Sequence, residues 1–368
     1  MAEKRGRRCL LLLWGLVCIL CLGGFFLLRH LDAACIAALP DQLGAERWET
    51  EGKEYAEAAL YLSDEEAIPD ESLGTIKTAV EKALTDGGVP SSDYPWYMAA
   101  SRTDAATLKN GSTEVSVSLT AYSGEYFLLH EMELRSGAFP REDALMHDTV
   151  VLCRQAAWEL FASDDIAGQY VTMNGTPLYV AAVVDLPEGK YNTLALDESC
   201  PAWVFSDCPA LPEDFTKSYT AIEMVLPQPI RNFAVSVMKS AVETEETDRV
   251  QDISGRFSLT NRLKVLKKLA ARGISQEERV LPWYENAALL TENRLARTLL
   301  PEGLCLLVPG LSLLLALYFL NRKRTWGLHS IRDFVSACYQ RHLEKRYYAK
   351  EAIRTREREA EASDDKES

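Results

Sequence analysis

Two long apolar runs without a charged residue bracket a polar stretch of the chain. The first is Cys9–Leu28, with twenty residues, and the second is Gly303–Asn321, with nineteen. A helix rises about 1.5 Å per residue, so each run is long enough to cross the roughly 30 Å apolar core of a membrane. We therefore expect a membrane protein with two transmembrane helices, at 9–28 and 299–321, on either side of an extracytoplasmic domain at 29–298.

Basic residues on the outer flank of each run predict the orientation. Four precede the first run (Lys4, Arg5, Arg7, Arg8), and three follow the second (Arg322, Lys323, Arg324). Because positive flanks tend to stay in the cytoplasm, residues 1–8 and a tail at 322–368 are expected to be cytoplasmic in a multi-pass cell-membrane protein. A cleaved signal peptide is the alternative for the first run, but signal peptides carry apolar regions of only about 7–15 residues.

The expected outer region is strongly acidic. Residues 29–298 carry 24 basic and 43 acidic side chains, a net charge of −19, against −14 for the whole chain. Nucleic-acid phosphates would be repelled by such a surface, so no nucleic-acid partner is expected. An acidic surface that keeps the domain soluble explains the charge without any specific partner.

Four of the nine cysteines fall in the outer region: Cys35, Cys153, Cys200 and Cys208. This number is too small for a disulfide scaffold. A disulfide between Cys200 and Cys208 would close a short loop in an oxidising compartment. A pair of reduced, buried thiols is the equally open alternative.

Hydrophobic periodicity and turn signals predict a mixed α/β outer domain with hairpins. Apolar residues recur at helical spacing from Leu73 to Leu84, which predicts a helix that opens at Ser72 and stops at Gly87-Gly88. Asn-Gly pairs at 110–111 and 174–175 predict two-residue hairpin turns, since such turns need positive φ at both positions.

Further elements are expected between the hairpins and near the second span. Residues 150–152 predict a short buried strand, followed by a helix that buries Leu160 and Phe161. Residues 54–62 suit either a strand or a helix. A basic helix at 262–272 would place Leu263, Leu266 and Leu269 on its apolar face, and a polar helix at 286–298 would lead into the second span.

Motifs for catalysis are almost absent. The chain has no Gly-x-x-x-x-Gly-Lys-Ser/Thr phosphate loop and no His-Glu-x-x-His zinc helix, so no nucleotide, other cofactor or metal is expected. His130-Glu131 is interpreted as a satisfied structural pair. Ser236 and Lys239 match a Ser-x-x-Lys nucleophile motif without its companion motifs, so we do not expect an enzyme.

The segment 134–185 carries a series of motifs. A glycine followed by an aromatic residue (Gly137, Phe139) precedes a Val-Val-Leu strand (150–152) and an Ala-x-x-Leu-Phe helix (157–161), and then come a Gly-Gln turn (168–169), an Asn-Gly turn (174–175) and a valine-rich strand (180–183). In this order the motifs resemble the extracytoplasmic core domain of MacB/FtsX-type ABC transporter permeases. Ala182 departs from the family pattern, because it replaces a glycine, and Ala167-Gly168 replaces the more usual Ile/Leu-Gly.

The resemblance implies a non-catalytic permease-like subunit of an ABC transporter or mechanotransmission complex, shortened to two spans, which works with a separate ATPase in a homo- or hetero-oligomer. It covers most of 48–320 and is specific over about fifty residues. The alternative is a two-span receptor or scaffold that binds through the outer domain; an anchored envelope enzyme is the least supported reading.

The tail carries an apolar stripe that is a candidate surface for coupling to the ATPase. Leu328, Ile331 and Val335 fall at helical spacing just past the second run. A basic amphipathic helix that lies on anionic lipid is the other reading of the same residues.

Overall fold

The computed structural model describes residues 2–49, 53–196, 200–212, 215, 218–242, 249–268, 281–323, 336–337 and 339–342. The chain divides into two units. One comprises Met1–Leu22 and Cys305–Ser368, and the other is Gly23–Leu304, which contains the outer domain.

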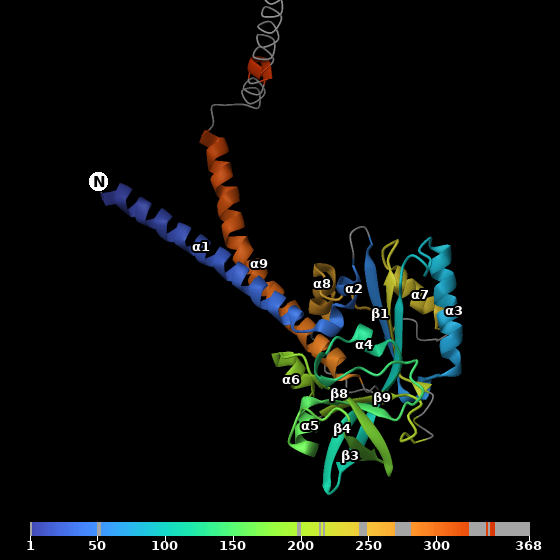
Figure 1. The fold of residues 1–368 in the computed structure, drawn as a ribbon. Coiled ribbons are helices and arrows are strands. Elements are labelled where there is room, and N and C mark those ends of the chain that lie inside the picture. Colours follow the sequence, from blue (N-terminus) through green and yellow to red (C-terminus); the bar gives the residue numbers. More distant parts are fainter. Residues whose placement is uncertain are drawn as a thin grey trace, which may run out of the picture. The chain divides into compact units, whose positions relative to one another are not determined.

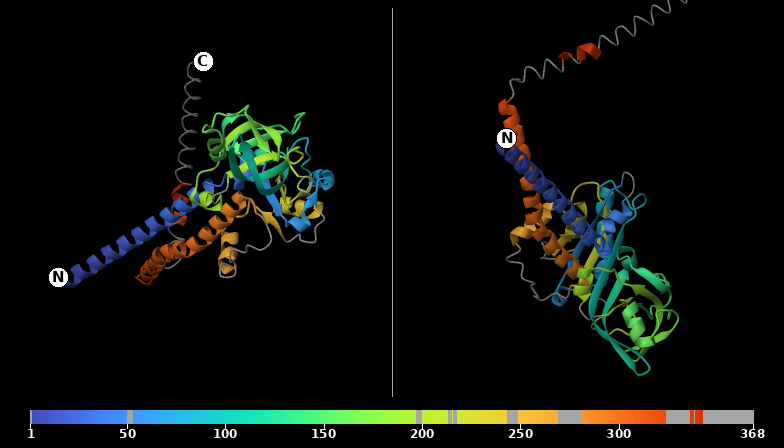
Figure 2. Two further views of the ribbon diagram at one scale, coloured as in Figure 1. Left: turned by 90° about the horizontal axis from the view of Figure 1, so that it is seen from below. Right: turned by 90° about the vertical axis from the view of Figure 1, so that its left-hand side faces the viewer.

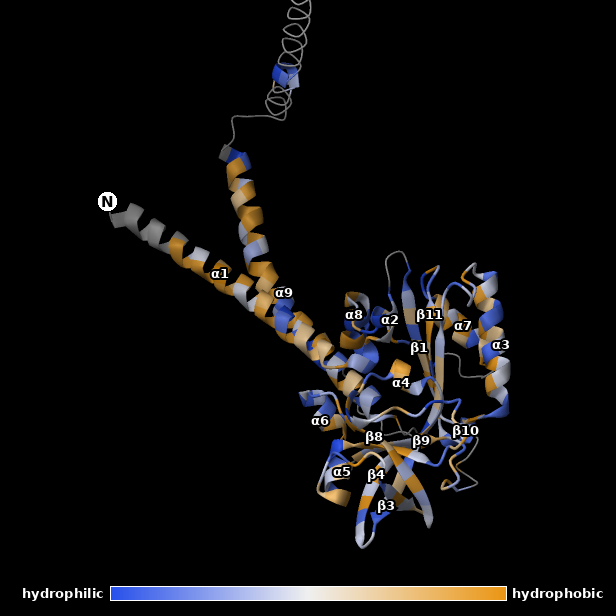
Figure 3. Cartoon of the chain, viewed as in Figure 1, coloured by the Kyte–Doolittle hydropathy of each residue, from blue (hydrophilic) through white to orange (hydrophobic). Residues whose placement is uncertain are grey.

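Two long helices contain the apolar runs. α1 is Ala2–Ala37 and α9 is Trp283–Lys323. Among the described residues, these are the two helices that are long and apolar enough to span a membrane, over Leu12–Ala37 and Trp283–Arg322 (Figure 3). α9 continues through Pro309-Gly310, as a membrane span tolerates. Within the first unit, the Trp14 indole donates a 2.8 Å hydrogen bond to Ser312 Oγ.

The outer domain is built on a ten-stranded mixed sheet (Figure 1). Its main path, in spatial order, is β12 (Val250–Asp252), β1 (Tyr55–Tyr61), β11 (Ala221–Pro227), β3 (Tyr97–Asn110), β4 (Thr113–Gly124), β9 (Cys200–Phe205), β6 (Thr149–Cys153), β8 (Thr176–Asp185) and β5 (Glu133–Gly137). The tenth strand, β7 (Tyr170–Met173), pairs with β3 and β8, and a separate small sheet pairs β2 (Ile68–Pro69) with β10 (Ser218–Tyr219).

Two helices cover one face of the first half of this sheet. α3 (Glu71–Asp86) and α7 (Phe233–Ala241) share a core with the even-numbered β1 residues Ala56, Ala58 and Leu60. α3 confirms the predicted helix, with Leu73, Ile76, Val80 and Leu84 buried and Gly87 at its C-cap. Every residue of β1 is buried, so the opposite face, which carries Glu57 and Tyr61, is covered as well.

The second half of the sheet packs around α5 (Arg154–Phe161), shown in green in Figure 2. β6 and α5 confirm the predicted strand and helix. Leu160 is buried, whereas Phe161 is only half-buried against the same core. The expectation that both side chains are buried is therefore correct for Leu160 alone.

The two hairpins differ in how well they follow the Asn-Gly signal. Asn174 (φ 51°) and Gly175 (φ 82°) join β7 to β8 as predicted. In the β3–β4 hairpin, Asn110 pairs with Thr113, so the turn residues are Gly111 and Ser112, one position later than expected. Asn110 instead donates a 3.0 Å hydrogen bond from its side chain to the Leu160 carbonyl.

Short helices and 3₁₀ turns connect the longer elements. They are the 3₁₀ turns η1 (Pro40–Gln42) and η2 (Asp64–Glu66) and the helices α2 (Gly44–Trp48), α4 (Tyr126–Leu129), α6 (Lys190–Leu196) and α8 (Leu259–Lys268). In α8 the buried residues are Arg262 and Val265, while Leu263 is 46% exposed. The expected leucine face is therefore wrong, because the ion-paired Arg262 turns the helix the other way; Leu269 lies outside the described residues.

Candidate functional site

The polar face of β1 and β11 carries a buried cluster of titratable side chains, which we call the His130 cluster: Asp41, Glu57, Tyr61, His130, Glu223 and Tyr284. Glu57 and Tyr61 alternate along β1, and Glu223 on β11 lies opposite Ala59, so all three side chains share one face. η1, the end of α4 and the start of α9 supply the other members. Every member is at least 96% buried.

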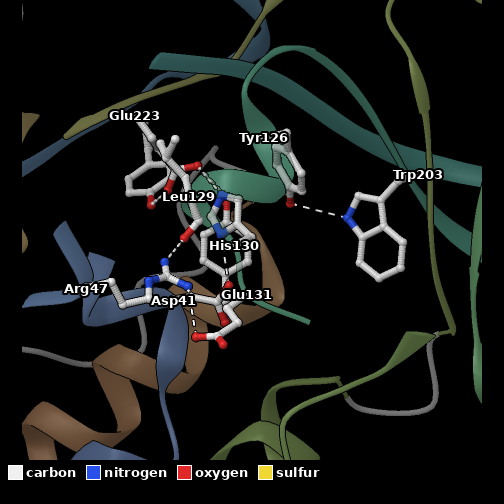
Figure 4. A network of polar contacts seen from close by, with 10 residues as sticks. Asp41, Arg47, Tyr126, Leu129, His130, Glu131, Trp203 and Glu223 are labelled. Carbon is white, nitrogen blue, oxygen red and sulfur yellow. Dashed lines mark hydrogen bonds and ion pairs between the residues drawn. The ribbon is translucent and has the colours of Figure 1, made fainter. Parts of the chain in front are cut away.

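His130 lies at the centre of the cluster (Figure 4). Nδ1 is 2.9 Å from Asp41 Oδ1, and Nε2 is 2.9 Å from Glu223 Oε2. Burial alone lowers the pKa of His130, but Glu223 and Asp41 outweigh that effect and raise the pKa to about 10. His130 is therefore an imidazolium at neutral pH, and both ring nitrogens donate. The ring contacts the rings of Tyr126 and Tyr284 in tilted arrangements, at centroid distances of 4.2 and 4.5 Å.

Glu223 accepts two more hydrogen bonds. The Tyr61 hydroxyl donates to Oε1 at 2.8 Å, and the Tyr284 hydroxyl donates to Oε2 at 2.9 Å. Burial raises the pKa of Glu223, but the charge and the hydrogen bond of His130 and the two tyrosine hydrogen bonds together lower it. Glu223 is thus held as a carboxylate, and its hydrogen bond from Tyr284 connects the first turn of α9 to β11.

Glu57 is the exception in this cluster. Burial first, and the nearby Glu223 charge second, raise the pKa of Glu57 to about 8. Its Oε2 has no hydrogen-bond partner among the described residues. The first residue of α2, Gly44, packs against this carboxyl so closely that a Cβ there would collide with Oε2. Glu57 is therefore an uncharged acid at neutral pH, with the backbone of α2 packed against its carboxyl group.

A second set of buried charges, the arginine network, connects β12 and α8 with the long helices: Asp32, Gln42, Arg256, Arg262, Glu285, Glu292, Thr298 and Glu302. Arg256 donates from both terminal nitrogens to Glu285, one bond being 2.6 Å, and from Nε to Glu292 Oε1 at 2.7 Å. It also donates to Gln42 Oε1 at 2.7 Å. This arginine therefore joins α9 to η1 at a point where its own side chain is 3% exposed.

Arg262 bridges three helices. From α8 it donates to Asp32 Oδ2 on α1 at 2.8 Å and to the Leu295 carbonyl on α9 at 2.8 and 3.0 Å. It also contacts Glu302 Oε1 at 3.3 Å, and the Thr298 hydroxyl donates to the same Asp32 oxygen at 2.7 Å. One guanidinium thus binds both the Oδ2 atom of the buried acid of α1 and a carbonyl of α9.

The energetics make these contacts mutually dependent. Removing one partner of a buried ion pair leaves an uncompensated charge, which costs about 3–5 kcal/mol. A displacement of α1 against α9 near Asp32 would separate the same groups. These contacts therefore hold the end of α1, the first turns of α9, α8 and the sheet in one arrangement.

Of the His130 cluster, the sequence singled out only His130 itself and none of its partners. His130 is a satisfied structural residue, as interpreted, but its partners are Asp41 and Glu223, whereas Glu131 pairs with Arg47 at 3.2 Å. The expected pairing with Glu131 is wrong because the two adjacent side chains leave the end of α4 in different directions. Asp32, four residues after the first apolar run, and Glu285 and Glu292, two helical turns apart, were the available signals for the network.

The other predicted residues lie elsewhere or outside the described residues. Leu328, Ile331 and Val335 lie outside them, so the coupling stripe stays a prediction. Cys200 and Cys208 are free, buried thiols in the structure, and Cys200 shares a hydrogen bond with Cys153. Their state in an oxidising compartment stays a prediction.

Two negative expectations concerned catalysis and metals. Ser236 of the Ser-x-x-Lys motif is exposed on α7. No group of three or more His, Cys, Asp or Glu side chains suited to a metal ion occurs within the part of the chain that the structure describes.

Comparison with known proteins gives matches to solved structures only: no protein-family model and no curated protein matches the sequence. The chain is similar to the extracellular domain of the ABC-type transporter YknZ from Gram-positive bacteria, at 15% identity and a TM-score of 0.38, over 54% of this chain and 99% of that one. It is also similar to the periplasmic region of MacB from Actinobacillus actinomycetemcomitans, at 14% identity and 0.39, over 59% and 93%. A domain of a putative permease from Porphyromonas gingivalis matches at 12% and 0.32, over 54% and 85%. The outer domain is thus similar to extracytoplasmic domains of MacB- and YknZ-type transporter permeases.

Proposed function

We propose that this chain is a non-catalytic, permease-like subunit of an ABC-type transport or mechanotransmission complex. In this proposal, a separate ATPase on the cytoplasmic face moves the two long helices, and the outer domain follows. The observation that carries the proposal is the buried bridge of Arg262 between Asp32 Oδ2 on α1 and the Leu295 carbonyl on α9.

The arrangement of charges supports a role in transmission. A domain that only needed an anchor would not require charges buried near the end of α1 and in the first turns of α9, because apolar packing of similar volume is often as stable or more stable. Buried ion pairs are directional, so they resist sliding of one helix along the other. Movement of α9 would pass through Arg256 to η1 and through Tyr284 to Glu223 on β11.

The energy source must be another protein. The sequence has no phosphate loop, so the chain itself is not expected to bind or hydrolyse ATP. The stripe of Leu328, Ile331 and Val335 follows α9 within a few residues and is the surface we propose for the ATPase contact. The resemblance of 134–185 to permease core domains supports this assignment.

The test replaces Leu328, Ile331 and Val335 with Asp in the full chain. We expect loss of ATPase copurification from membranes, with unchanged protease resistance of the outer domain. The matched control places the same three charges outside the stripe, at Thr325, Ser330 and Ser336, and should keep the ATPase. Retention of the ATPase by the stripe variant would exclude this coupling surface.

A two-span receptor or scaffold is the second candidate. The described chain has two candidate spans, which are enough to anchor a binding domain without forming a transport path. Failure to recover any ATPase with the wild-type chain would favour this second function over the first.

A further inference from the structure

α8 exposes leucines on its surface. Leu259 is 61% exposed, and Leu263 is 46% exposed. Together with Lys267 they follow one another at four-residue intervals, so the three side chains lie along one stripe of the helix. The buried side of α8 is formed by Arg262 and Val265. The stripe therefore belongs to the surface of the outer domain and not to its core.

Lysines give the same surface a positive charge. Lys264, Lys267 and Lys268 are all exposed. The ion pairs that α8 forms with other described residues come from Arg262, and none of the three lysines takes part in one. Residues 29–298 carry 24 basic and 43 acidic side chains, so acids are plentiful in this part of the chain. The lysines are nevertheless unpaired within the described ranges and can receive a negatively charged partner.

α8 lies close to the point where the two long helices enter their apolar runs. Arg262 donates to Asp32 on α1 at 2.8 Å and contacts Glu302 on α9 at 3.3 Å, and Figure 1 shows α8 beside α9. Asp32 follows the end of the first run, Leu28, by four residues, which is about 6 Å along a helix, and Glu302 directly precedes the second run. When the runs cross a membrane, α8 is therefore at the level of the lipid headgroups next to the outer domain.

From this arrangement we infer that α8 is a lipid-binding helix, which lies on the membrane surface and contacts anionic phospholipids in the leaflet next to the outer domain. The leucines enter the boundary between headgroups and acyl chains, as the apolar face of an interfacial helix does. The ammonium groups of the lysines meet the lipid phosphates, since their flexible stems let them reach the headgroups.

Two arguments favour an anionic lipid surface as the partner of α8. The spans hold the helix beside the headgroups, so the effective concentration of lipid is high and a few side chains are enough for binding. Anionic lipid also supplies the negative charge that the unpaired lysines lack, whereas zwitterionic lipid has no net charge. The contact needs no ATPase, so it stands apart from the proposed transmission.

Quenching by brominated lipid tests this inference in the full chain, reconstituted in nanodiscs. The environment-sensitive fluorescent amino acid Anap replaces Leu263, and the same probe at Thr107, exposed on β3, is the reference. All nanodiscs hold the same fraction of phosphatidylcholine with dibrominated acyl chains, and the remaining lipid is either plain phosphatidylcholine or phosphatidylglycerol. We expect stronger quenching at 263 with phosphatidylglycerol, and loss of this excess at about 1 M salt, where charges are screened beyond about 3 Å.

Charge variants separate the role of the lysines from the position of the helix. The test variant removes the three unpaired charges of α8 together: Lys264→Gln, Lys267→Gln and Lys268→Gln. Each lysine should shift the equilibrium of lipid contact about fivefold, so this variant should lose the excess quenching. The matched control removes three charges elsewhere in the outer domain and should behave as the wild type: Lys77→Gln, Lys82→Gln and Lys109→Gln.

Three results would overturn the inference. Equal quenching at 263 and 107 would remove α8 from the membrane surface. Equal quenching at 263 in the two lipids would show that the helix does not distinguish anionic from zwitterionic lipid. An excess that the α8 variant keeps would show that the lysines do not bind the headgroups.

Discussion

The neutral Glu57 side chain should make the outer domain less stable as the pH rises from acid to neutral. Burial and Glu223 raise its pKa to about 8 from 4.5. Between these values the unfolded chain releases a proton that the folded chain keeps, so the free energy of unfolding falls by about 1.4 kcal/mol per pH unit. From pH 4.5 to pH 6.5, this one group should remove about 2 kcal/mol, because the unfolded carboxyl is already half ionised at pH 4.5.

His130 and Glu223 contribute in other parts of the pH range. His130 has its pKa raised to about 10, so its contribution is complete below its usual value of 6.5 and is lost only as the pH rises toward 10. Glu223 has a lowered pKa, so its contribution is complete above 4.5 and is lost at lower pH. A comparison of the wild type with a Glu57 variant separates the contribution of Glu57 from those of the neighbouring groups.

Glu57→Gln keeps the shape of the side chain and removes its proton equilibrium. Guanidinium unfolding of the full chain in detergent, followed by tryptophan fluorescence, should give equal stabilities at pH 4.5. At pH 6.5 the variant should be about 2 kcal/mol more stable than the wild type. Glu81→Gln, an exposed acid, should follow the wild type at every pH. If the free energy of unfolding changed with pH in the same way in Glu57→Gln and in the wild type, Glu57 would not be a neutral, buried acid.

Three further predictions concern packing and the thiols. Gly44→Ala should destabilise the chain by about 1–3 kcal/mol, because its Cβ would press on the carboxyl group of Glu57. Gly74→Ala in α3, whose Cβ meets nothing, should instead stabilise it by up to about 1 kcal/mol in the same unfolding assay. Leu160→Ala should cost about 2–5 kcal/mol, and an unchanged midpoint would remove α5 from the core. After alkylation of the denatured protein, mass spectrometry should find the alkyl group on both Cys200 and Cys208. A disulfide would instead leave both cysteines without the alkyl group and lower the mass by two hydrogens.

Local patterns predicted the elements that local forces determine. α3 follows from the spacing of Leu73 to Leu84 and from the glycines after it, and the β7–β8 turn follows from Asn174-Gly175, because only neighbouring residues set these structures. The same reasoning placed the β3–β4 turn one residue too early, at Asn110. The side chain of Asn110 instead donates a hydrogen bond to the carbonyl of Leu160, 50 positions away.

The arginine network could not be predicted in this way. Arg262 and Asp32 are 230 positions apart, and Glu223 and His130 are 93 apart. A buried arginine looks like a surface residue in a sequence, because its partners are visible only in the fold. For the same reason the spacing of the leucines in α8 predicted the wrong buried face. The buried residues of this helix are Arg262 and Val265.

The most direct test of the proposed function measures a distance inside the outer domain while the ATPase works. Spin labels carried by unnatural amino acids at Thr107 on β3 and Lys264 on α8, both exposed, would report it in membranes that contain the copurified ATPase. Transmission through the arginine network predicts that ATP changes the distance distribution in the wild type and that Arg262→Met, provided its outer domain still resists protease, abolishes the change. An unchanged distribution in the wild type, or the same change in Arg262→Met, would contradict it.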